Sequence, residues 1–312
     1  MFTHSTLKRF VKDYSLPIQL FREPYFDYFL KLYNKQFSTQ EKFDLLSRTI
    51  ESLDGESNFM EQYHKIKEDI LNTMKENKKY IEFNSISLEE FDIPSHNFSK
   101  NNVFNCKNVG KIFISIDLKK ANFQAMKYYS SDLVLNHSSY ESFMDNFTDL
   151  EYMKQSKYIR QVIFGNLNPK RQIKIQQYLT YNLLKCLIEG DFIKKEDVKM
   201  LSPDEIVCEF NIEDYLLYNN YDIHLQNIIK NEMRLDVDVE IYNLKQIGTF
   251  DYYVKEFINK TGYEIMCVPV IYFAQIYKLY NNIDLNDYDL TFFYENQVAM
   301  FLKPLNLLEN NL

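Results

Sequence analysis

The sequence has few of the residues from which phosphate-binding loops are usually built. Only 6 glycines and 7 prolines occur among its 312 residues, and neither GxGxxG nor GxxxxGK[ST] is present. In Rossmann and P-loop proteins these motifs bring backbone N–H groups against the phosphates of a nucleotide. The sequence therefore argues against both of these protein classes.

Cysteines are also few, and long apolar runs are missing. The 4 cysteines are far apart and form no CxxC pair, which argues against a zinc site and against a disulfide framework. The first residues, MFTHSTLKRFVKDY, lack the apolar centre of a signal peptide, and no stretch is long enough to span a bilayer. We expect a cytoplasmic protein in a reducing compartment, without a membrane partner.

Tryptophan is missing too, although the chain has 25 tyrosines and 25 phenylalanines. Together with the many Asn, Lys and Ile residues, this bias is typical of an AT-rich genome, such as that of a virus, a mobile element or a low-GC microbe. With 46% hydrophobic residues the chain should fold around a substantial core. The net charge of −8 argues against a broadly basic surface, but a local basic groove could still bind nucleic acid.

The pattern of apolar residues predicts an α+β protein with three consecutive regions. Residues 1–80 are expected to form a helical N-terminal region, 81–234 a mixed core and 235–312 a C-terminal α/β extension. In the first region, Ser38-Thr39-Gln40-Glu41 has the form of a capping box at the start of a helix.

The stretch KIFISIDLKKANFQAMKYY, residues 111–129, organises the predicted core. Residues 112–116 are apolar, β-branched or aromatic and predict a buried strand, which ends at Asp117. The apolar residues from 121 to 129 have helical spacing. A carboxylate between a buried strand and a helix is a common ligand of divalent metals in nucleotide enzymes. Alternatively, Asp117 caps the helix that follows.

Further along, a helical block is expected at 139–190 and a hairpin with arms at 198–201 and 206–210, because Ser202-Pro203-Asp204 favours a turn. Beyond it we expect a helix at 222–233, a strand at 235–244 and a helix at 250–262. In the predicted strand, Asp236, Asp238 and Glu240 alternate with apolar residues. The alternation indicates a half-buried strand with a solvated acidic face rather than a metal site.

Three patterns occur in the order found in template-directed nucleic-acid polymerases. DLKKANF at 117–123 resembles motif A of the polymerase palm domain, as it occurs in reverse transcriptases. The basic segment at 157–184 resembles motif B of family B polymerases, and SPDEIVCEF at 202–210 is similar to the acidic hairpin of motif C. The last pattern departs from the family in Pro203, where a small residue is usual, and in Glu205, where a second Asp is usual.

The resemblance implies a palm-like core and a two-metal mechanism of nucleotidyl transfer. Asp117, Asp204 and Glu205 would be the catalytic carboxylates and the ligands of Mg²⁺ or Mn²⁺, because phosphoryl transfer requires neutralisation of the phosphate charge. Nucleoside triphosphates and a nucleic acid would be the partners. The basic residues expected to bind their phosphates are Arg160, Lys170, Arg171 and Lys174.

Asn122 occupies the motif A position that distinguishes the two kinds of sugar in the resembled family. A bulky aromatic residue there excludes a 2′-hydroxyl, whereas Asn can donate a hydrogen bond to it and accept one from it. The resemblance therefore favours ribonucleotides and RNA.

Two other functions remain open. A metal-dependent nuclease would use the same carboxylate chemistry. A non-catalytic scaffold with a degenerate palm would instead bind a protein partner through a surface rich in Tyr and Phe. Ser202 to Glu205 also has the composition of an ordinary turn, and Lys and Arg on a helix usually form a solvated face.

Overall fold

The computed structural model describes residues 2–211, 220–295 and 297–306, which fold into two compact units. Unit 1 consists of Met1–Lys75, Ser138–Leu167 and Val268–Asn306, and the described part of unit 2 of Glu76–His137 and Asn168–Cys267. Helices and an antiparallel sheet confirm the predicted α+β class. The units do not follow the three consecutive regions predicted at 1–80, 81–234 and 235–312. The three regions were predicted from changes in composition along the chain. Each unit instead combines segments that are far apart in the sequence, because strand pairing and helix packing bring them together.

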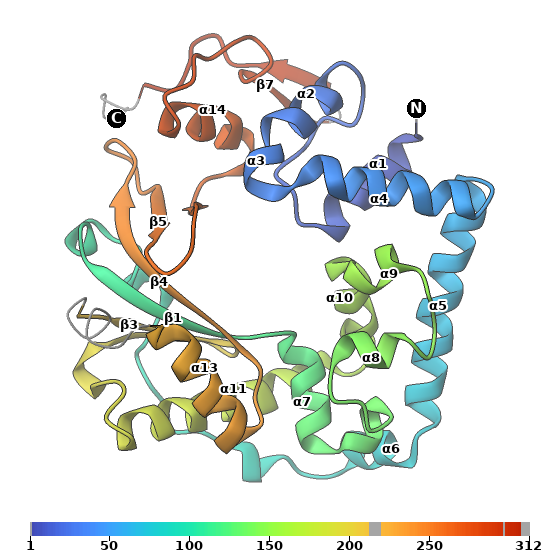
Figure 1. Ribbon diagram of the computed structural model, residues 1–312, viewed down its shortest axis with the longest axis vertical. Helices are drawn as coiled ribbons and strands as arrows, with labels where there is room; N and C mark the ends of the chain where they lie inside the picture. The colour runs from blue at the N-terminus through green and yellow to red at the C-terminus, as the bar shows by residue number, and fades with distance from the viewer. Residues whose placement is uncertain (1, 212–219, 296, 307–312) are drawn as a thin grey trace. The chain divides into compact units, whose positions relative to one another are not determined.

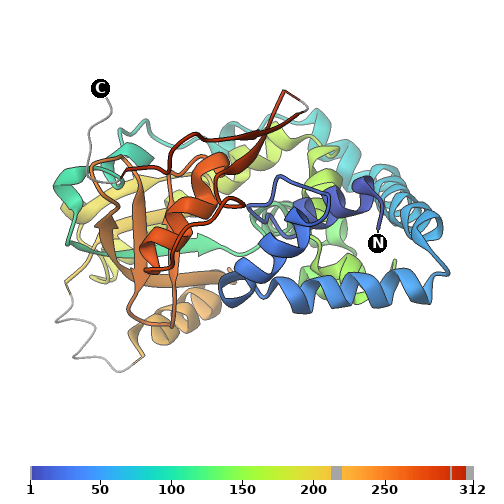
Figure 2. The same ribbon diagram turned by 90° about the horizontal axis from the view of Figure 1, so that it is seen from above.

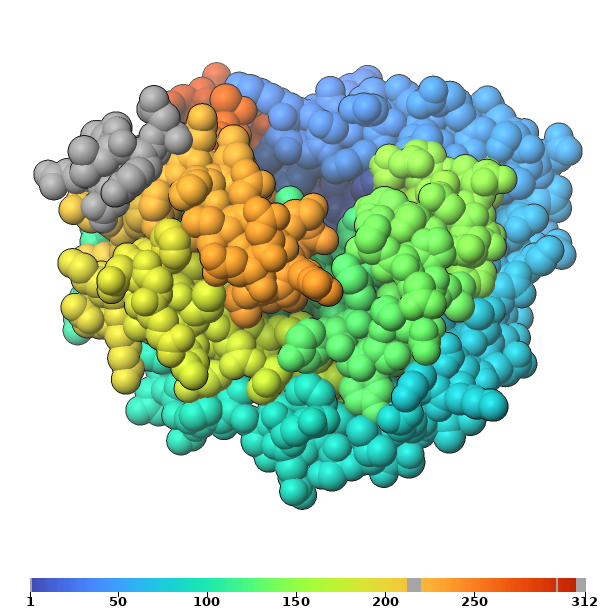
Figure 3. Space-filling model, turned by 60° about the horizontal axis from the view of Figure 1, so that its bottom comes forward, coloured from blue at the N-terminus to red at the C-terminus, as the bar shows by residue number. Residues whose placement is uncertain are grey.

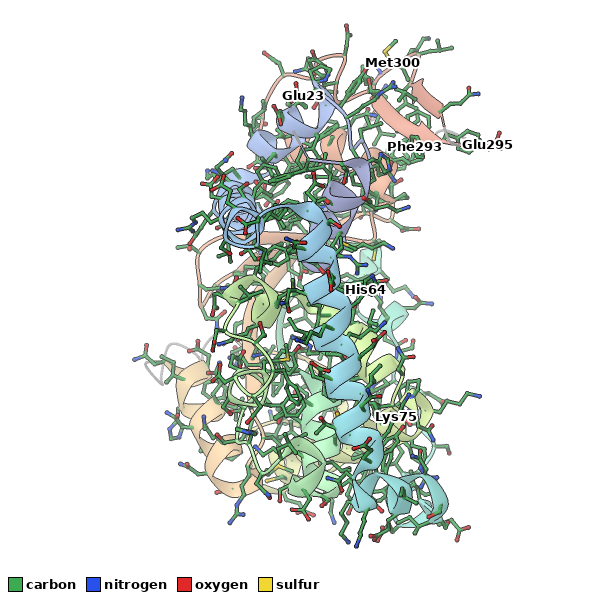
Figure 4. The ribbon with its side chains drawn as sticks, turned by 90° about the vertical axis from the view of Figure 1, so that its right-hand side faces the viewer. Glu23, His64, Lys75, Phe293, Glu295 and Met300 are labelled. Atoms are coloured by element: carbon green, nitrogen blue, oxygen red, sulfur yellow. The ribbon has the colours of Figure 1, made fainter. Side chains whose placement is uncertain are left out.

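Unit 1 is mainly helical. Its elements are α1 (His4–Asp13), α2 (Tyr25–Leu32), α3 (Asn34–Phe37), α4 (Thr39–Ser52), α5 (Glu56–Glu76, ending one residue into unit 2), α8 (Tyr140–Met144), α9 (Glu151–Gln155), α10 (Lys157–Gly165), α14 (Val270–Tyr280) and the hairpin β7 (Thr291–Tyr294) and β8 (Gln297–Met300). Figure 4 shows α5 along its length, with His64 near its middle and Lys75 near its end. α14 lies beside α2 and α3 (Figures 1 and 2), where Tyr33 contacts the rings of Phe273 and Tyr277.

The capping box predicted at Ser38 is wrong, although α4 does begin at Thr39. Ser38 directly follows α3 and has a left-handed backbone with φ 49°, and its side chain makes no capping hydrogen bond. An N-cap residue normally has an extended backbone, which directs its side chain at the first turn of the helix. The short connection between α3 and α4 imposes a different backbone conformation here.

Unit 2 contains a six-stranded sheet in which neighbouring strands are antiparallel, in the order β2-β3-β1-β4-β5-β6. The strands are β1 (Ile112–Leu118), β2 (Val198–Leu201), β3 (Glu205–Glu209), β4 (Val237–Gln246), β5 (Tyr253–Phe257) and β6 (Tyr263–Met266). The helices of this unit are α6 (Lys78–Ser85), α7 (Ala121–Tyr129), α11 (Pro169–Glu189) and α13 (Tyr221–Met233), with short 3-10 turns between Glu89 and Asn108, at Ser131–Val134 and at Lys195–Asp197. The predicted strand at 112–116, hairpin at 198–210 and helix at 222–233 are therefore confirmed.

The helix predicted at 250–262 is wrong, because Tyr253–Phe257 forms β5. The apolar residues there recur at spacings that also fit a helix, so that periodicity could not distinguish the two. β5 instead pairs with β4 on one side and with β6 on the other. The residues that pair with it lie 7 to 15 positions away in the sequence.

The two faces of the sheet differ in what covers them. Ile114, Ile116 and Cys208 are buried on the face against which α11 and α13 pack (Figure 1). Figure 3 shows α13 in orange beside the yellow segment that ends α11. On the opposite face, Phe113 and Tyr242 belong to an apolar cluster that also includes Val103 from the segment before β1. This second face also carries the acidic residues of the candidate site.

Candidate acidic site on the open face of the sheet

Asp117 lies near the end of β1, on the face of the sheet opposite α13. Its Cα is paired with that of Glu205 on β3 and with that of Asp238 on β4. Side chains of directly paired residues in antiparallel strands point to the same face, a few ångströms apart. The sheet therefore brings three carboxylates side by side from segments that are about ninety and thirty residues apart in the chain.

The hairpin turn between β2 and β3 is held against the end of β1. Leu118 N donates to the Asp204 carbonyl at 2.7 Å. Within the turn, the hydroxyl of Ser202 accepts from the backbone N–H of Glu205 at 2.9 Å, and Thr180 on α11 donates to the Pro203 carbonyl at 2.7 Å. Asp204 is exposed, whereas Glu205 is half-buried at the start of β3. The structure thus brings all three predicted carboxylates, Asp117, Asp204 and Glu205, to one end of the sheet.

Lys255 on β5 lies among further carboxylates of the same face. Its Nζ is 3.4 Å from Glu264, 3.5 Å from Glu240 and 3.9 Å from Glu205. The same Nζ lies 5.1 Å from the centre of the Tyr242 ring, and the side chain is only 7% exposed. Burial lowers the pKa of Lys255, but the three glutamates raise it by more, so that it lies above its ordinary value. The ammonium therefore remains charged at neutral pH.

The carboxyl group of Asp117 is a weaker acid than usual, because its pKa is raised. Burial, followed by the charges of Asp204, Glu205 and Glu240, raises the pKa of Asp117 to about 7, although Lys255 lowers it. Within the described part of the chain, the Asp117 carboxylate makes no hydrogen bond or ion pair. The expectation that Asp117 caps the following helix is not met, because Lys120 is the N-cap residue of α7 and no side chain caps it.

The chemistry of these donors fits Mg²⁺ or Mn²⁺, which prefer carboxylate oxygens. Burial raises the pKa of Asp117 most and repulsion among the carboxylates raises it further, and a divalent cation would relieve that repulsion. Among the described residues, however, no group of three or more His, Cys, Asp or Glu side chains converges closely enough to hold a metal as they stand. Side chains at the Asp117 end of the face would have to turn inward to ligate one.

The predicted sugar-recognition residue, Asn122, lies in the first turn of α7 and is half-buried. Its side-chain oxygen accepts a hydrogen bond from Gln176 on α11. Gln176 is buried, and its carbonyl accepts from the Thr180 hydroxyl that also holds the hairpin turn. One buried polar chain thus links Asn122 to the turn that carries Asp204.

The predicted phosphate-binding residues do not form one basic group. Lys174 pairs with Asp92 at 2.6 Å, and Arg171 donates to the Ile86 carbonyl at 2.7 Å, so both hold the segment before β1. Lys170 is exposed in the first turn of α11. Arg160 belongs to unit 1, where its guanidinium lies 5.7 Å from the centre of the Tyr140 ring.

Four residues of this face were not predicted as site residues, namely Asp238, Glu240, Lys255 and Glu264. The alternation of acids in the strand at 235–244 was the signal for the first two. The predicted half-buried strand with a solvated acidic face is confirmed, because buried and half-exposed residues alternate along the first part of β4. Its register places Asp238 directly opposite Asp117 and Glu240 directly opposite Ser115. Lys255 was missed because its segment was predicted to be helical.

No family model, no curated protein and no solved structure was found to match this chain. None of the helices in the described ranges is long and apolar enough to cross a membrane.

Proposed function

We propose that this protein transfers nucleotidyl groups to a nucleic acid, with the acidic end of the sheet as its active site. The pairing of Asp117 with Glu205, beside the turn that carries Asp204, is the observation on which the proposal depends. Carboxylates from separate strands are needed at one place when divalent cations must be held beside phosphates. A strand and a hairpin that are neighbours in one sheet meet that need.

The connectivity of the sheet also supports the proposal. The segment between β1 and the hairpin includes α7 and α11, and α13 connects the hairpin to β4. In the sheet, β3 lies between β2 and β1, and β1 lies next to β4. This order, with helices on one face of the sheet and the carboxylates at one end of the other face, supports a palm-like core.

Each residue then has a role that follows from its chemistry. Mg²⁺ or Mn²⁺, when bound, would neutralise charge on the triphosphate, and Asp117, Asp204 and Glu205 would hold it, with Asp238 beside them. Asn122 retains its amide N–H groups as donors for a ribose hydroxyl, since only its oxygen is used by Gln176. We therefore favour ribonucleoside triphosphates and RNA as substrates.

Extension of a labelled primer on a template, with Mn²⁺ or Mg²⁺ and all four nucleotides, tests the proposal. Asp117→Asn should lower the rate at least about 10²-fold, because it removes a carboxylate that would hold the cation beside the phosphates. Glu189→Gln, an exposed change at the end of α11, is the matched control and should leave the rate unchanged. Metal-dependent shortening of the primer would identify a nuclease instead.

The position of Lys255 favours a second candidate, a non-catalytic protein with the same fold. An ammonium among the glutamates compensates charge that a second metal would otherwise compensate. Such a protein would bind a partner, and its exposed aromatic residues, Tyr128, Tyr288, Phe293 and Tyr294, are candidate contacts. Neither extension nor shortening of any strand by the purified chain, together with co-purification of one protein, would favour this candidate.

A further inference from the structure

A small cavity in unit 1 combines aromatic side chains with two carboxylates. Its volume is about 240 Å³, and the residues that line it are Phe2, Leu7, Glu23, Phe26, Asp27 and Phe43. An apolar cavity of about 150 Å³ is large enough for benzene, whereas pockets for drug-sized ligands begin at about 300 Å³. The cavity therefore has room for one small group, such as the head group of a larger molecule.

The inner part of the cavity is apolar. Leu7 and Phe26 are buried, and Phe2 and Phe43 are half-buried. The ring centre of Phe43 lies 5.7 Å from that of Phe2 and 5.5 Å from that of Phe26, and the ring planes are inclined by 69° and 53°. The three rings therefore form walls of different orientation, as in an aromatic cage, rather than a flat stack.

The two carboxylates lie on the solvent side of these rings. Glu23 directly precedes α2 (Figure 4), and Asp27 is in the first turn of this helix. Both side chains are exposed, and neither makes a hydrogen bond or an ion pair with any described residue. The cavity thus carries two negative charges that have no counter-charge in the described part of the chain.

No basic side chain of the described residues lines the cavity. Arg22 and Lys42 are adjacent in sequence to lining residues, but both have contacts elsewhere. The guanidinium of Arg22 lies 5.9 Å from the centre of the Tyr25 ring, and Lys42 donates to the Phe37 carbonyl at 2.6 Å. A positively charged ligand would therefore meet attraction at this cavity without a competing cation from its lining.

We infer that this cavity binds a quaternary ammonium group, such as that of choline or of a trimethylated lysine. Aromatic faces attract cations, and the carboxylates of Glu23 and Asp27 add to the attraction. The rings and Leu7 offer no hydrogen-bond acceptor, so a primary ammonium or a guanidinium would leave N–H groups unpaired. A quaternary ammonium has no N–H group and presents methyl groups to the rings. The inference concerns unit 1 and does not depend on the proposed function.

Isothermal titration calorimetry of the full chain with choline at low salt tests the inference. We expect saturable binding of one choline per chain. The neutral carbon analogue, in which a tert-butyl group replaces the trimethylammonium group, has the same shape and should bind at least about tenfold more weakly, because the cation–π attraction is lost. A short peptide with trimethylated lysine distinguishes the source of the ligand. Tighter binding of this peptide than of choline identifies a protein partner, and weaker binding identifies a free small molecule.

Two variants test the position of the site. Phe2→Leu removes one ring but keeps an apolar side chain, and should weaken choline binding about fivefold or more. Glu23→Gln/Asp27→Asn should weaken it about three- to tenfold at low salt and less at high salt, where exposed charges are screened. The matched controls are Phe147→Leu, at another half-buried phenylalanine of unit 1, and Glu61→Gln, at an exposed glutamate of α5. Both controls should bind choline as the unaltered chain does.

Absence of saturable choline binding would overturn the inference, and so would equal binding of the neutral analogue. Unchanged binding in both test variants would place the ligand elsewhere and reject this cavity as its site. An unmethylated lysine peptide that binds as tightly as the trimethylated one would show that alkylation of the ammonium is not recognised. Should Phe2→Leu fail to fold, the double variant decides, because its two changes are on exposed side chains.

Discussion

Two buried lysines, one in each unit, differ in how their charge is compensated. Lys278 in unit 1 is 6% exposed and lies 2.8 Å from Asp289, which is itself fully buried. It also donates to the Asp284 carbonyl at 2.9 Å, and Tyr28 donates to Asp289 at 2.6 Å. Lys255 in unit 2 is 7% exposed, but none of its three glutamates is closer than 3.4 Å.

The comparison distinguishes a closed pair, in which one cation balances one anion, from an open site, in which the carboxylates outnumber the cation. Around Lys278 a single cation meets a single anion, and polar neighbours satisfy both, which is typical of a group that only stabilises a fold. Around Lys255 negative charge is in excess, and together with burial, which is the larger cause, the nearby carboxylates raise the pKa of Asp117. An excess of charge that costs stability is common at functional sites.

Breaking the closed pair should have the largest effect on stability. Lys278→Met leaves the fully buried Asp289 without its cation, and we expect a loss of about 3–5 kcal/mol in the free energy of unfolding. Urea denaturation followed by circular dichroism measures this. The double variant Lys278→Met/Asp289→Leu should recover most of the loss, since no unpaired charge remains. A double variant as unstable as the single one would show that the unpaired charge of Asp289 is not the cause of the loss.

Removing the charge of Asp117 should change the free energy of unfolding less, and should stabilise the protein rather than destabilise it. The pKa of Asp117 is raised to about 7, above its ordinary value of about 4, so the folded chain binds a proton that the unfolded chain has lost between these pH values. Stability due to Asp117 is therefore full below pH 4 and falls as the pH rises to about 7. Asp117→Asn should remove this decline and stabilise the chain by about 1 kcal/mol at pH 8, after allowance for solvent screening.

Thermal melts of both proteins from pH 4 to pH 8 measure this difference. The two curves should meet near pH 4 and separate as the pH rises. Parallel curves would mean that neither burial nor the neighbouring carboxylates raise the pKa of Asp117, which would remove the evidence for an uncompensated charge at this site.

A lysine on the surface should show the smallest effect. Lys245 on β4 lies only 2.6 Å from Glu256 on β5, closer than Lys255 is to any of its partners, but it is 49% exposed. Lys245→Met should change the free energy of unfolding by less than about 0.5 kcal/mol, because water competes for exposed charges. A loss as large as that of Lys278→Met would mean that distance rather than burial decides the strength of these pairs.

The strand at 112–116, the hairpin at 198–210 and the helix at 222–233 were predictable because each has a local signal. Continuous β-branched residues mark the strand, and Ser202-Pro203-Asp204 marks the turn. Asp117 and Glu205 lie at the ends of these elements, so sequence order was enough to suggest that they meet. The α+β class followed from the same signals.

The rest of the site depended on pairing that the sequence does not reveal locally. Lys255 lies in a segment whose apolar spacing fits a helix, and its partners come from β3, β4 and β6. Lys174 and Arg171 were predicted to bind phosphate because of their charge alone. They instead hold Asp92 and Ile86, which no pattern on α11 could indicate.

The division of the chain has a consequence for how the protein forms during synthesis. Unit 1 combines Met1–Lys75 with Ser138–Leu167 and Val268–Asn306, whereas β6, the final strand of the sheet in unit 2, ends at Met266. A ribosome would therefore release the whole sheet before α14, which packs beside Tyr33, has been made. The helices that emerge first gain this partner only after α14 has been made, and truncation before residue 268 would remove it while sparing the acidic face.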